Sequence, residues 1–261
     1  MSDILKVSAI QTYLQWESID ENLKDFEELI SQISDTVDLI VLPEMFSTGF
    51  TMQPSRVAES MNDKTVQWMK SIAKKRNTAL VGSLVIKQND KYFNRCVFVH
   101  PNGTLETYDK RHTFTLAGEH KVYTAGKKNL TVNYRGWKIC PLICYDLRFP
   151  VWSRNTQDYD ILIYMANWPK PRINAWDILL KARAVENMSY TIGINRVGAD
   201  ENKYEYSGHS KFIDCLGNVI DEIEESKEGI MTCNLKKSSQ DEIRNKLNFL
   251  NDKDAFTIQG L

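Results

Sequence analysis

The stretch Ile139-Cys140-Pro141-Leu142-Ile143-Cys144-Tyr145-Asp146-Leu147-Arg148-Phe149-Pro150 is an apolar run that stops at a thiol and continues into polar, turn-prone residues. A short apolar run bounded by turn residues predicts a buried strand. Ligands of open α/β sheets bind at the carboxyl ends of the strands. We therefore expect the Cys144 thiol at a strand end, where a substrate can reach it while the backbone is held rigidly.

Two more residues with suitable chemistry end predicted strands. Glu44 follows the apolar run at residues 38–43, and Lys110 follows a short strand pattern at residues 103–109, after an Asn-Gly turn. A carboxylate, an amine and a thiol therefore end three separate strands.

Strand and helix patterns alternate along the chain, apart from a different pattern in residues 79–108. Apolar residues three and four positions apart predict helices, whereas short apolar or alternating runs between turn residues predict strands. The predicted helices cover residues 19–33, 63–76, 149–156, 175–190 and 238–247. The predicted strands cover residues 5–11, 38–42, 130–134, 137–143, 160–166, 191–197, 208–214, 219–223 and 229–234. An antiparallel meander is predicted over residues 79–86, 92–100 and 104–108.

We expect one α/β domain over residues 1–261, because no Gly/Ser linker, Pro-rich stretch or low-complexity segment interrupts the pattern. The helices need two separate sheet faces to cover. A four-layer αββα sandwich of two mixed sheets accommodates both the meander and the alternating halves. The periodicity leaves a single large sheet open as the alternative.

The composition indicates a globular protein with a small-molecule partner. The chain has 33 basic and 34 acidic residues, and no block of Lys or Arg marks a nucleic-acid surface. The N-terminus lacks the pattern of a signal peptide, and no apolar run approaches the length of a membrane span. We therefore expect a cytoplasmic protein that binds neither nucleic acid nor a membrane.

The five cysteines indicate neither a disulfide framework nor a metal centre. Their number is odd and they are scattered along the chain, which is typical of a protein from a reducing compartment. Cys140 and Cys144 lack the second ligand pair of a zinc site, so we expect no metal and interpret Cys140 as a core residue. Cys144 is left as the candidate nucleophile.

A cysteine attacks a carbonyl carbon as the thiolate, so Cys144 needs a base. No histidine lies in a strand-end motif with an Asn or Asp partner; the four are His100, His112, His120 and His209. A carboxylate at a neighbouring strand end can take the proton instead, which makes Glu44 the candidate base. Lys110 would place a positive charge beside the oxyanion, and the backbone N–H of Tyr145 would supply a second donor.

Three motifs give the chain a resemblance to the nitrilase superfamily of carbon-nitrogen hydrolases. They are Leu42-Pro43-Glu44 with the downstream Gly49, Tyr108-Asp109-Lys110-Arg111-His112, and the stretch from Ile143 to Pro150, in the order in which the family has them. This resemblance implies the αββα sandwich, a homodimer, and a catalytic set without a cofactor, formed here by Glu44, Lys110 and Cys144. It also implies a supporting second glutamate, for which Glu119 is the candidate.

Within the superfamily, the chain looks most like the omega-amidase branch, whose members hydrolyse the side-chain amide of 2-oxoglutaramate and 2-oxosuccinamate. Residues 45–50, 113–120 and 165–169 carry this similarity. It implies a small amide substrate with an acidic group. Because a guanidinium suits a carboxylate, Arg172 is the candidate for binding that group, and Trp168 is the candidate for the pocket wall.

Several alternatives stay open at this point. A nitrilase, an N-carbamoyl amine hydrolase or an amidase of deaminated glutathione would use the same three catalytic residues. The fold could also serve as a catalytically silent binding scaffold or as a thiol redox sensor. Single residues have structural interpretations as well: Glu119 as an ion-pair partner only, Arg172 as a surface side chain, and Asp146 and Arg148 as residues that fix the turn.

Overall fold

Two six-stranded sheets form the centre of the protein, whose computed structural model describes residues 2–259. The first sheet has the order β14-β1-β2-β3-β4-β5 and contains β1 (Ile4–Gln11), β2 (Leu39–Val41), β3 (Ala79–Gln88), β4 (Lys91–Val99), β5 (Leu105–Asp109) and β14 (Gly229–Lys236). The second sheet has the order β13-β12-β9-β8-β7-β6 and contains β6 (Val132–Tyr134), β7 (Trp137–Ile143), β8 (Ile161–Ala166), β9 (Tyr190–Asn195), β12 (Lys211–Ile213) and β13 (Val219–Glu222). Both sheets are mixed, because β1–β3 and β7–β9 run parallel and the outer strands run antiparallel.

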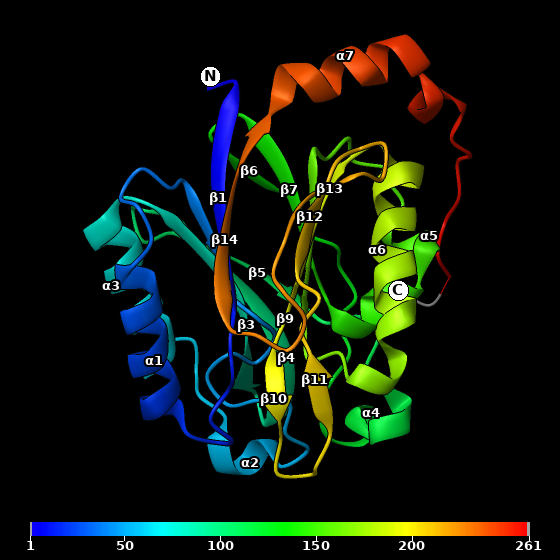
Figure 1. Cartoon of the computed structure of the whole chain (residues 1–261). Coiled ribbons are helices and arrows are strands. Elements are labelled where there is room, and N and C mark those ends of the chain that lie inside the picture. Colours follow the sequence, from blue (N-terminus) through cyan, green and yellow to red (C-terminus); the bar gives the residue numbers. More distant parts are fainter. Residues whose placement is uncertain (1, 260–261) are drawn as a thin grey trace.

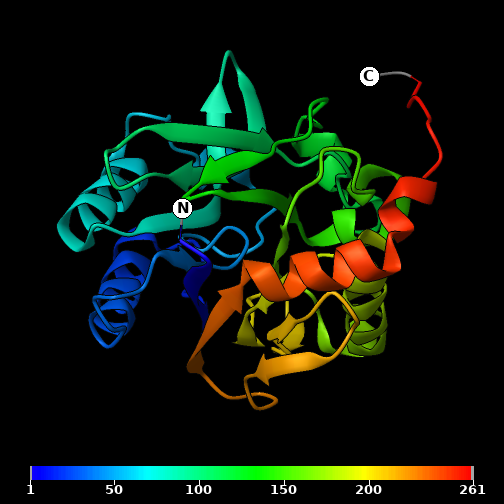
Figure 2. The ribbon, with the colours of Figure 1, turned by 90° about the horizontal axis from the view of Figure 1, so that it is seen from above.

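Helices cover the outer face of each sheet, which gives four layers (Figures 1 and 2). The helices α1 (Ile19–Ser31) and α3 (Lys64–Arg76) lie on the first sheet, and α6 (Ile173–Asn187) lies on the second. The remaining helices are α2 (Pro54–Val57), α4 (Glu119–Val122), α5 (Pro150–Ser153) and α7 (Lys237–Leu247). The predicted four-layer sandwich is therefore confirmed, and the single large sheet is excluded.

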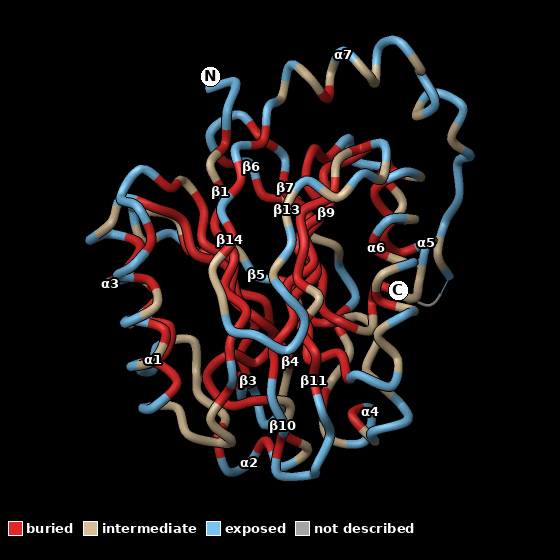
Figure 3. The backbone as a smooth tube through the Cα atoms, viewed as in Figure 1, coloured by how far each residue is buried: buried red, intermediate tan, exposed pale blue. Residues whose placement is uncertain are grey.

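Apolar side chains between the four layers hold these elements together. Between the sheets, inward side chains such as Val7 of β1, Phe98 of β4 and Ile163 of β8 are fully buried. Between the first sheet and its helices, Phe26 of α1 and Met69 of α3 pack against strand residues. Figure 3 shows the buried residues concentrated in the two sheets and on the inward sides of the helices. Removal of this apolar surface from water is the main favourable contribution to folding.

Helix α6 approaches the second sheet closely because Gly193 of β9 has no side chain. A Cβ atom at Gly193 would lie 2.4 Å from Leu180 Cδ1 and 2.8 Å from Trp176 Cζ2. Both of these α6 side chains are fully buried. The glycine therefore sets the distance between this helix and the sheet that carries Cys144.

The region after β9 differs from the prediction. The prediction of one strand over residues 191–197 is wrong, because β9 ends at Asn195 and a separate hairpin follows, with β10 (Val197–Ala199) and β11 (Glu205–Ser207). These two strands contain the polar or small residues Gly198, Ala199, Glu205 and Ser207 and form no apolar run, so the sequence does not reveal them. The helix predicted over residues 149–156 is likewise reduced to α5.

The carboxyl ends of several strands meet at one end of the sandwich. Glu44, Lys110 and Asn167 follow β2, β5 and β8, and their side chains or backbone groups are hydrogen-bonded to one another. The hairpin of β10 and β11 lies at the same, lower end in Figure 1. This end is where the candidate site forms.

We predict that Leu180→Ala lowers the free energy of unfolding by about 2–5 kcal/mol, since it leaves a cavity between α6 and β9. Lys181→Ala, at the next and exposed position of the same helix, should change this free energy by less than about 0.5 kcal/mol. Urea denaturation followed by circular dichroism measures both values. Equal effects of the two substitutions would contradict the packing described here.

Candidate active site

A lysine held between two glutamates forms the centre of the site. Lys110 Nζ lies 2.9 Å from Glu44 Oε1 and 3.0 and 3.1 Å from the two carboxylate oxygens of Glu119. The exposed fraction is 1% for the Lys110 side chain and 0% for both glutamates. The structure thus brings together two predicted catalytic residues and the predicted second glutamate, and Lys110 is not a solvated surface amine.

Hydrogen bonds from both sheets fix the Glu44 carboxylate. Asn94 Nδ2, in β4, donates to Oε1 at 2.8 Å, and the backbone N–H of Asn167, just after β8, donates to Oε2 at 2.8 Å. Asn167 Nδ2 also donates to the Glu44 carbonyl at 2.7 Å. Asn94 is itself oriented, because its Oδ1 accepts a hydrogen bond from Ser83 Oγ at 2.8 Å. The carboxylate therefore joins the two sheets and has little freedom to rotate.

Burial and opposite charges set the protonation of the cluster. Burial disfavours the Lys110 ammonium, but Glu119 and Glu44 outweigh this effect and raise the pKa of Lys110. Burial raises the pKa of Glu119, while Lys110 opposes the rise. The backbone N–H of Phe114 also donates to the Glu119 carboxylate. Lys110 is therefore a fixed positive charge at neutral pH.

Cys144 begins a 3-10 helix (Cys144–Arg148) directly after β7 and faces this cluster. Its φ of +43° lies in the left-handed region, which is a costly conformation for a residue other than glycine. The residue is 9% exposed, more than Lys110 and the two glutamates, and it lines a cavity. Burial raises the pKa of Cys144, Glu44 raises it further and Lys110 opposes the rise. The thiol therefore holds its proton at neutral pH and needs a base to become a thiolate.

Asp146 holds the turn that presents Cys144. Its Oδ2 atom accepts hydrogen bonds from the backbone N–H of Ile143 at 3.1 Å and from the Tyr108 hydroxyl at 2.8 Å. The Asp146 side chain is fully buried. These contacts agree with the interpretation of Asp146 as a residue that fixes the turn.

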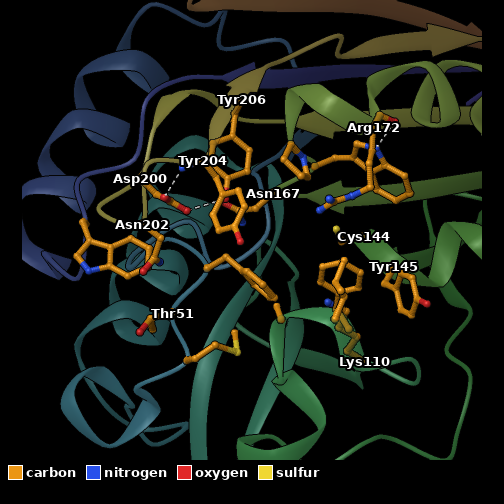
Figure 4. Close-up of a pocket in the computed structure, with 18 of the residues that line it drawn as sticks. Thr51, Lys110, Cys144, Tyr145, Asn167, Arg172, Asp200, Asn202, Tyr204 and Tyr206 are labelled. Atoms are coloured by element: carbon orange, nitrogen blue, oxygen red, sulfur yellow. Dashed lines mark hydrogen bonds between the residues drawn. The ribbon is translucent and has the colours of Figure 1, made fainter.

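The Cys144 thiol opens into a cavity of about 530 Å³. This volume is within the range of roughly 300–1,000 Å³ that is typical of small-molecule sites. The wall includes Tyr145, Trp168 and Arg172, three of the residues predicted for the site. Figure 4 shows the side that carries Cys144, Lys110, Tyr145 and Arg172 facing a side that carries Thr51, Asp200 and Asn202.

Arg148, interpreted as a residue that fixes the turn, lies in the 3-10 helix after β7 and also lines the cavity. Its guanidinium carbon lies 4.9 Å from the centroid of the Trp168 ring. Arg172 lines the cavity as well, so it is not a surface side chain outside the site. Its guanidinium carbon lies 5.2 Å from the centroid of the Phe114 ring. Within residues 2–259 neither guanidinium forms an ion pair, whereas neighbouring Lys170 pairs with Glu205. The guanidinium groups of Arg148 and Arg172 thus line the cavity with N–H donors that a ligand can bind.

The sequence reasoning assigned no role to Asn94 or Asn167. Asn167 directly follows β8, the same strand-end position that singled out Glu44, so this signal was present in the sequence. Asn94 lies within β4, and its contact with Glu44 comes from strand pairing across the sheet. No local sequence pattern announces such a contact.

Two further observations concern metals and membranes. Within residues 2–259, no group of three or more His, Cys, Asp or Glu side chains is arranged to hold a metal ion. In the same part of the chain, no helix has both the length and the apolar character needed to cross a membrane.

A family model described as carbon-nitrogen hydrolase matches residues 6–245. The chain belongs to this family. The resemblance to the nitrilase superfamily and the prediction of a carbon-nitrogen hydrolase are therefore confirmed. This membership makes the cluster around Cys144 the candidate active site of a hydrolase.

Relatives of known description cover nearly the whole chain. "Omega-amidase YafV" of Yersinia enterocolitica is 41% identical over 254 residues, which are 97% of this chain and 98% of that protein. "2-oxoglutaramate amidase" of Bacillus subtilis (strain 168) is 32% identical and covers 94% of this chain and 96% of its own length. Among solved structures, XC1258 from Xanthomonas campestris, a CN-hydrolase superfamily protein with an arsenic adduct in its active site, is 36% identical. It superimposes with a TM-score of 0.96 and covers 99% of this chain and 100% of its own.

We predict that Lys110→Met lowers the free energy of unfolding by about 3–5 kcal/mol at pH 8, because it leaves two buried carboxylates without their cation. The loss should be smaller at pH 5. Lys110 opposes the rise in the pKa of Glu119, so its removal raises that pKa further above the unfolded value. A carboxyl group whose pKa is higher in the folded state binds more protons when the chain is folded. Stability is therefore lost as the pH rises from the pKa of the unfolded chain to the higher pKa of the folded protein.

Urea unfolding at pH 5 and pH 8 measures this pH dependence. Lys127→Met is the matched control, because Lys127 is exposed and its replacement should have little effect at either pH. A Lys110→Met loss that is the same at both pH values would contradict the buried ion cluster.

Proposed function

We propose that this chain is an omega-amidase, which hydrolyses the side-chain amide of small 2-oxo acid amides such as 2-oxoglutaramate and 2-oxosuccinamate. One observation carries the proposal: a thiol at the wall of a cavity faces a buried Glu44–Lys110–Glu119 cluster, and the same cavity has two guanidinium groups that form no ion pair with any described residue. The omega-amidases and 2-oxoglutaramate amidase that resemble the chain over almost its full length support the same activity.

The first step transfers a proton and forms a thioester. Glu44 takes the proton of the Cys144 thiol as the sulfur attacks the amide carbon, and the carbonyl oxygen becomes an oxyanion. Lys110 and the backbone N–H of Tyr145 stabilise that oxyanion. Glu44 then gives its proton to the amide nitrogen, the C–N bond breaks, and ammonia leaves. The acyl group stays on Cys144 as a thioester.

The second step returns the enzyme to its starting state. Glu44 takes a proton from a water molecule, whose oxygen attacks the thioester carbon, and a second oxyanion forms. The C–S bond breaks, the sulfur takes the proton back from Glu44, and the 2-oxo acid is released. In total, the amide and one water molecule are converted to ammonia and the 2-oxo acid, and no cofactor is needed.

The second glutamate explains why the lysine can serve the oxyanion. In the resting site, Lys110 faces two carboxylates, so the three groups carry one net negative charge. When Glu44 takes the thiol proton, Glu119 alone balances Lys110 and the negative charge moves to the oxyanion. Glu119 therefore keeps the buried ammonium paired with a carboxylate while Glu44 is protonated. We assign Glu119 this supporting role.

The substrate carboxylate would bind to the two arginines. Arg148 and Arg172 line the same cavity as Cys144, and aromatic rings hold both guanidinium groups in place. A guanidinium donates two parallel hydrogen bonds to a carboxylate. Trp168 supports Arg148 and walls the cavity, so it contributes to the site through packing.

We also propose that residues 1–261 act as a single catalytic domain and that the enzyme works as a cytoplasmic homodimer. Size-exclusion chromatography with light scattering measures the oligomeric state. A monomer that keeps full activity would contradict the dimer.

The main test is an ammonia-release assay across 2-oxoglutaramate, 2-oxosuccinamate, glutamine, a simple nitrile, an N-carbamoyl amine and deaminated glutathione. We expect the largest kcat/KM for the two oxo acid amides. Cys144→Ala should fold and lose activity by at least about 10³-fold, because no thioester can form. Cys215→Ala, which changes a thiol outside the cavity, should keep its activity.

Other results of this assay would point elsewhere. Activity confined to the nitrile, the N-carbamoyl amine or deaminated glutathione would replace the omega-amidase with the corresponding amidase or nitrilase. Full activity of Cys144→Ala would refute the thioester mechanism. No turnover of any substrate would favour a binding scaffold.

A second prediction concerns the carboxylate. Arg148→Met and Arg172→Met should each raise KM for 2-oxoglutaramate by about 10- to 100-fold, the value of a hydrogen bond to a charged group. Turnover of propionamide, which has no carboxylate, should change far less. Lys170→Met removes a nearby cation that pairs with Glu205 and serves as the control. Equal losses on both amides would show that the arginines act through packing alone.

A further inference from the structure

The Asp146 carboxylate connects the two segments that carry Lys110 and Cys144. One oxygen, Oδ2, accepts from the Ile143 backbone N–H and the Tyr108 hydroxyl. The other oxygen, Oδ1, accepts from His112 twice, from its backbone N–H at 3.0 Å and from its ring Nδ1 at 2.7 Å. The fully buried Asp146 carboxylate thus accepts four hydrogen bonds, two on each oxygen.

These four donors come from the first sheet, from the segment that follows it and from the second sheet. Tyr108 lies in β5 of the first sheet, and His112 follows two residues after Lys110. Ile143 ends β7 of the second sheet and immediately precedes Cys144. The position of Asp146 therefore sets the spacing between the lysine that would bind the oxyanion and the thiol that would attack.

The His112 ring is itself held in place. It stacks on Phe149 with the ring centroids 3.6 Å apart and the planes 4° from parallel. The Trp152 ring lies nearly perpendicular to it, with the centroids 6.0 Å apart. Its side chain is 21% exposed. Because a carboxylate only accepts, the proton on Nδ1 is fixed on the side of Asp146.

The conformation of Cys144 makes such a support necessary. A positive φ at a residue other than glycine persists only where the surroundings hold it, and strained nucleophiles at strand ends are of this kind. The hydrogen bond from Ile143 to Asp146 lies one residue before the strained position. His112 orients the carboxylate that accepts this bond.

We infer that His112 is a positioning residue for the nucleophile: through Asp146, it fixes the strained Cys144 turn at its distance from Lys110. The inference rests on the proposed role of Cys144. His112 lines a separate shallow groove with Phe149, Trp152 and Ile258, and it is not among the described residues that line the reaction cavity. It acts on Cys144 through Asp146 and does not touch the substrate.

Two substitutions separate the hydrogen bond from the stacking. His112→Asn keeps a side-chain N–H donor near the Nδ1 position and removes the ring. His112→Phe keeps a ring against Phe149 and removes the donor. His100→Phe is the matched control, because His100 also contacts a carboxylate, Glu106 at 2.8 Å, and an aromatic ring, Phe98 at 4.9 Å, but lies outside the site.

Two quantities are measured on each variant: kcat and KM for 2-oxoglutaramate, and the rate at which iodoacetamide alkylates Cys144, followed by peptide mass analysis. We expect His112→Phe to lower kcat by about 10- to 100-fold, with a smaller change in KM and a slower alkylation of Cys144. His112→Asn should stay within about threefold of the unmodified chain on kcat and alkylation. His100→Phe should match the unmodified chain.

The outcomes decide the inference. Unchanged kcat and alkylation in His112→Phe would overturn it, and equal losses in His112→Phe and His112→Asn would overturn it in favour of stacking. If His112→Phe does not fold, Tyr108→Phe removes a donor from the other Asp146 oxygen and should give the same slow alkylation. If the unmodified chain does not turn over 2-oxoglutaramate, the proposed function fails. The alkylation rate of Cys144 still tests the role of His112 in that case, because it needs no substrate.

Discussion

The buried ammonium of Lys110 is the constraint on which the site depends. A charge without access to water is stable only when opposite charges and hydrogen bonds surround it. Glu44 and Glu119 provide those charges at about 3 Å, and both are themselves fully buried. The chain therefore has to bring residues 44, 110 and 119 together whenever it folds, and the ends of β2 and β5 are fixed relative to each other.

This constraint also explains how the second sheet is aligned with the first. Glu44 needs donors for its second oxygen, and the backbone N–H of Asn167 after β8 supplies one. The strand β7, which carries Cys144 at its end, pairs in parallel with β8. The hydrogen bond from Asn167 to Glu44 therefore also places the Cys144 thiol beside the Glu44–Lys110–Glu119 cluster. The groups stand in position before a substrate arrives, so the reaction requires little rearrangement of dipoles in a medium of low dielectric constant.

The sequence predicted the fold and the strand-end residues because both follow from local patterns. Glu44, Lys110 and Cys144 each stand at the end of a predicted strand, and the predicted sandwich of two mixed sheets agrees with the structure. The other residues of the site depend on pairing between distant segments. Asn94 reaches Glu44 from the middle of a strand, and Arg148 reaches the cavity because the 3-10 helix after Cys144 turns it toward Trp168. No local pattern contains that information.

The histidines show the same limit in a sharper form. In the sequence, no histidine lies in a strand-end motif with an Asp or Asn partner, yet His112 and Asp146 are hydrogen-bonded across 34 residues of chain. Their pairing does not make His112 a base for the thiol, because His112 is not among the described residues that line the cavity of Cys144. In the proposed mechanism, the carboxylate of Glu44 carries the proton, while we infer that His112 and Asp146 control the geometry. A cysteine with a raised pKa can therefore act as a nucleophile without a histidine base, provided that a fixed carboxylate takes its proton during attack and a fixed lysine stabilises the charge that results.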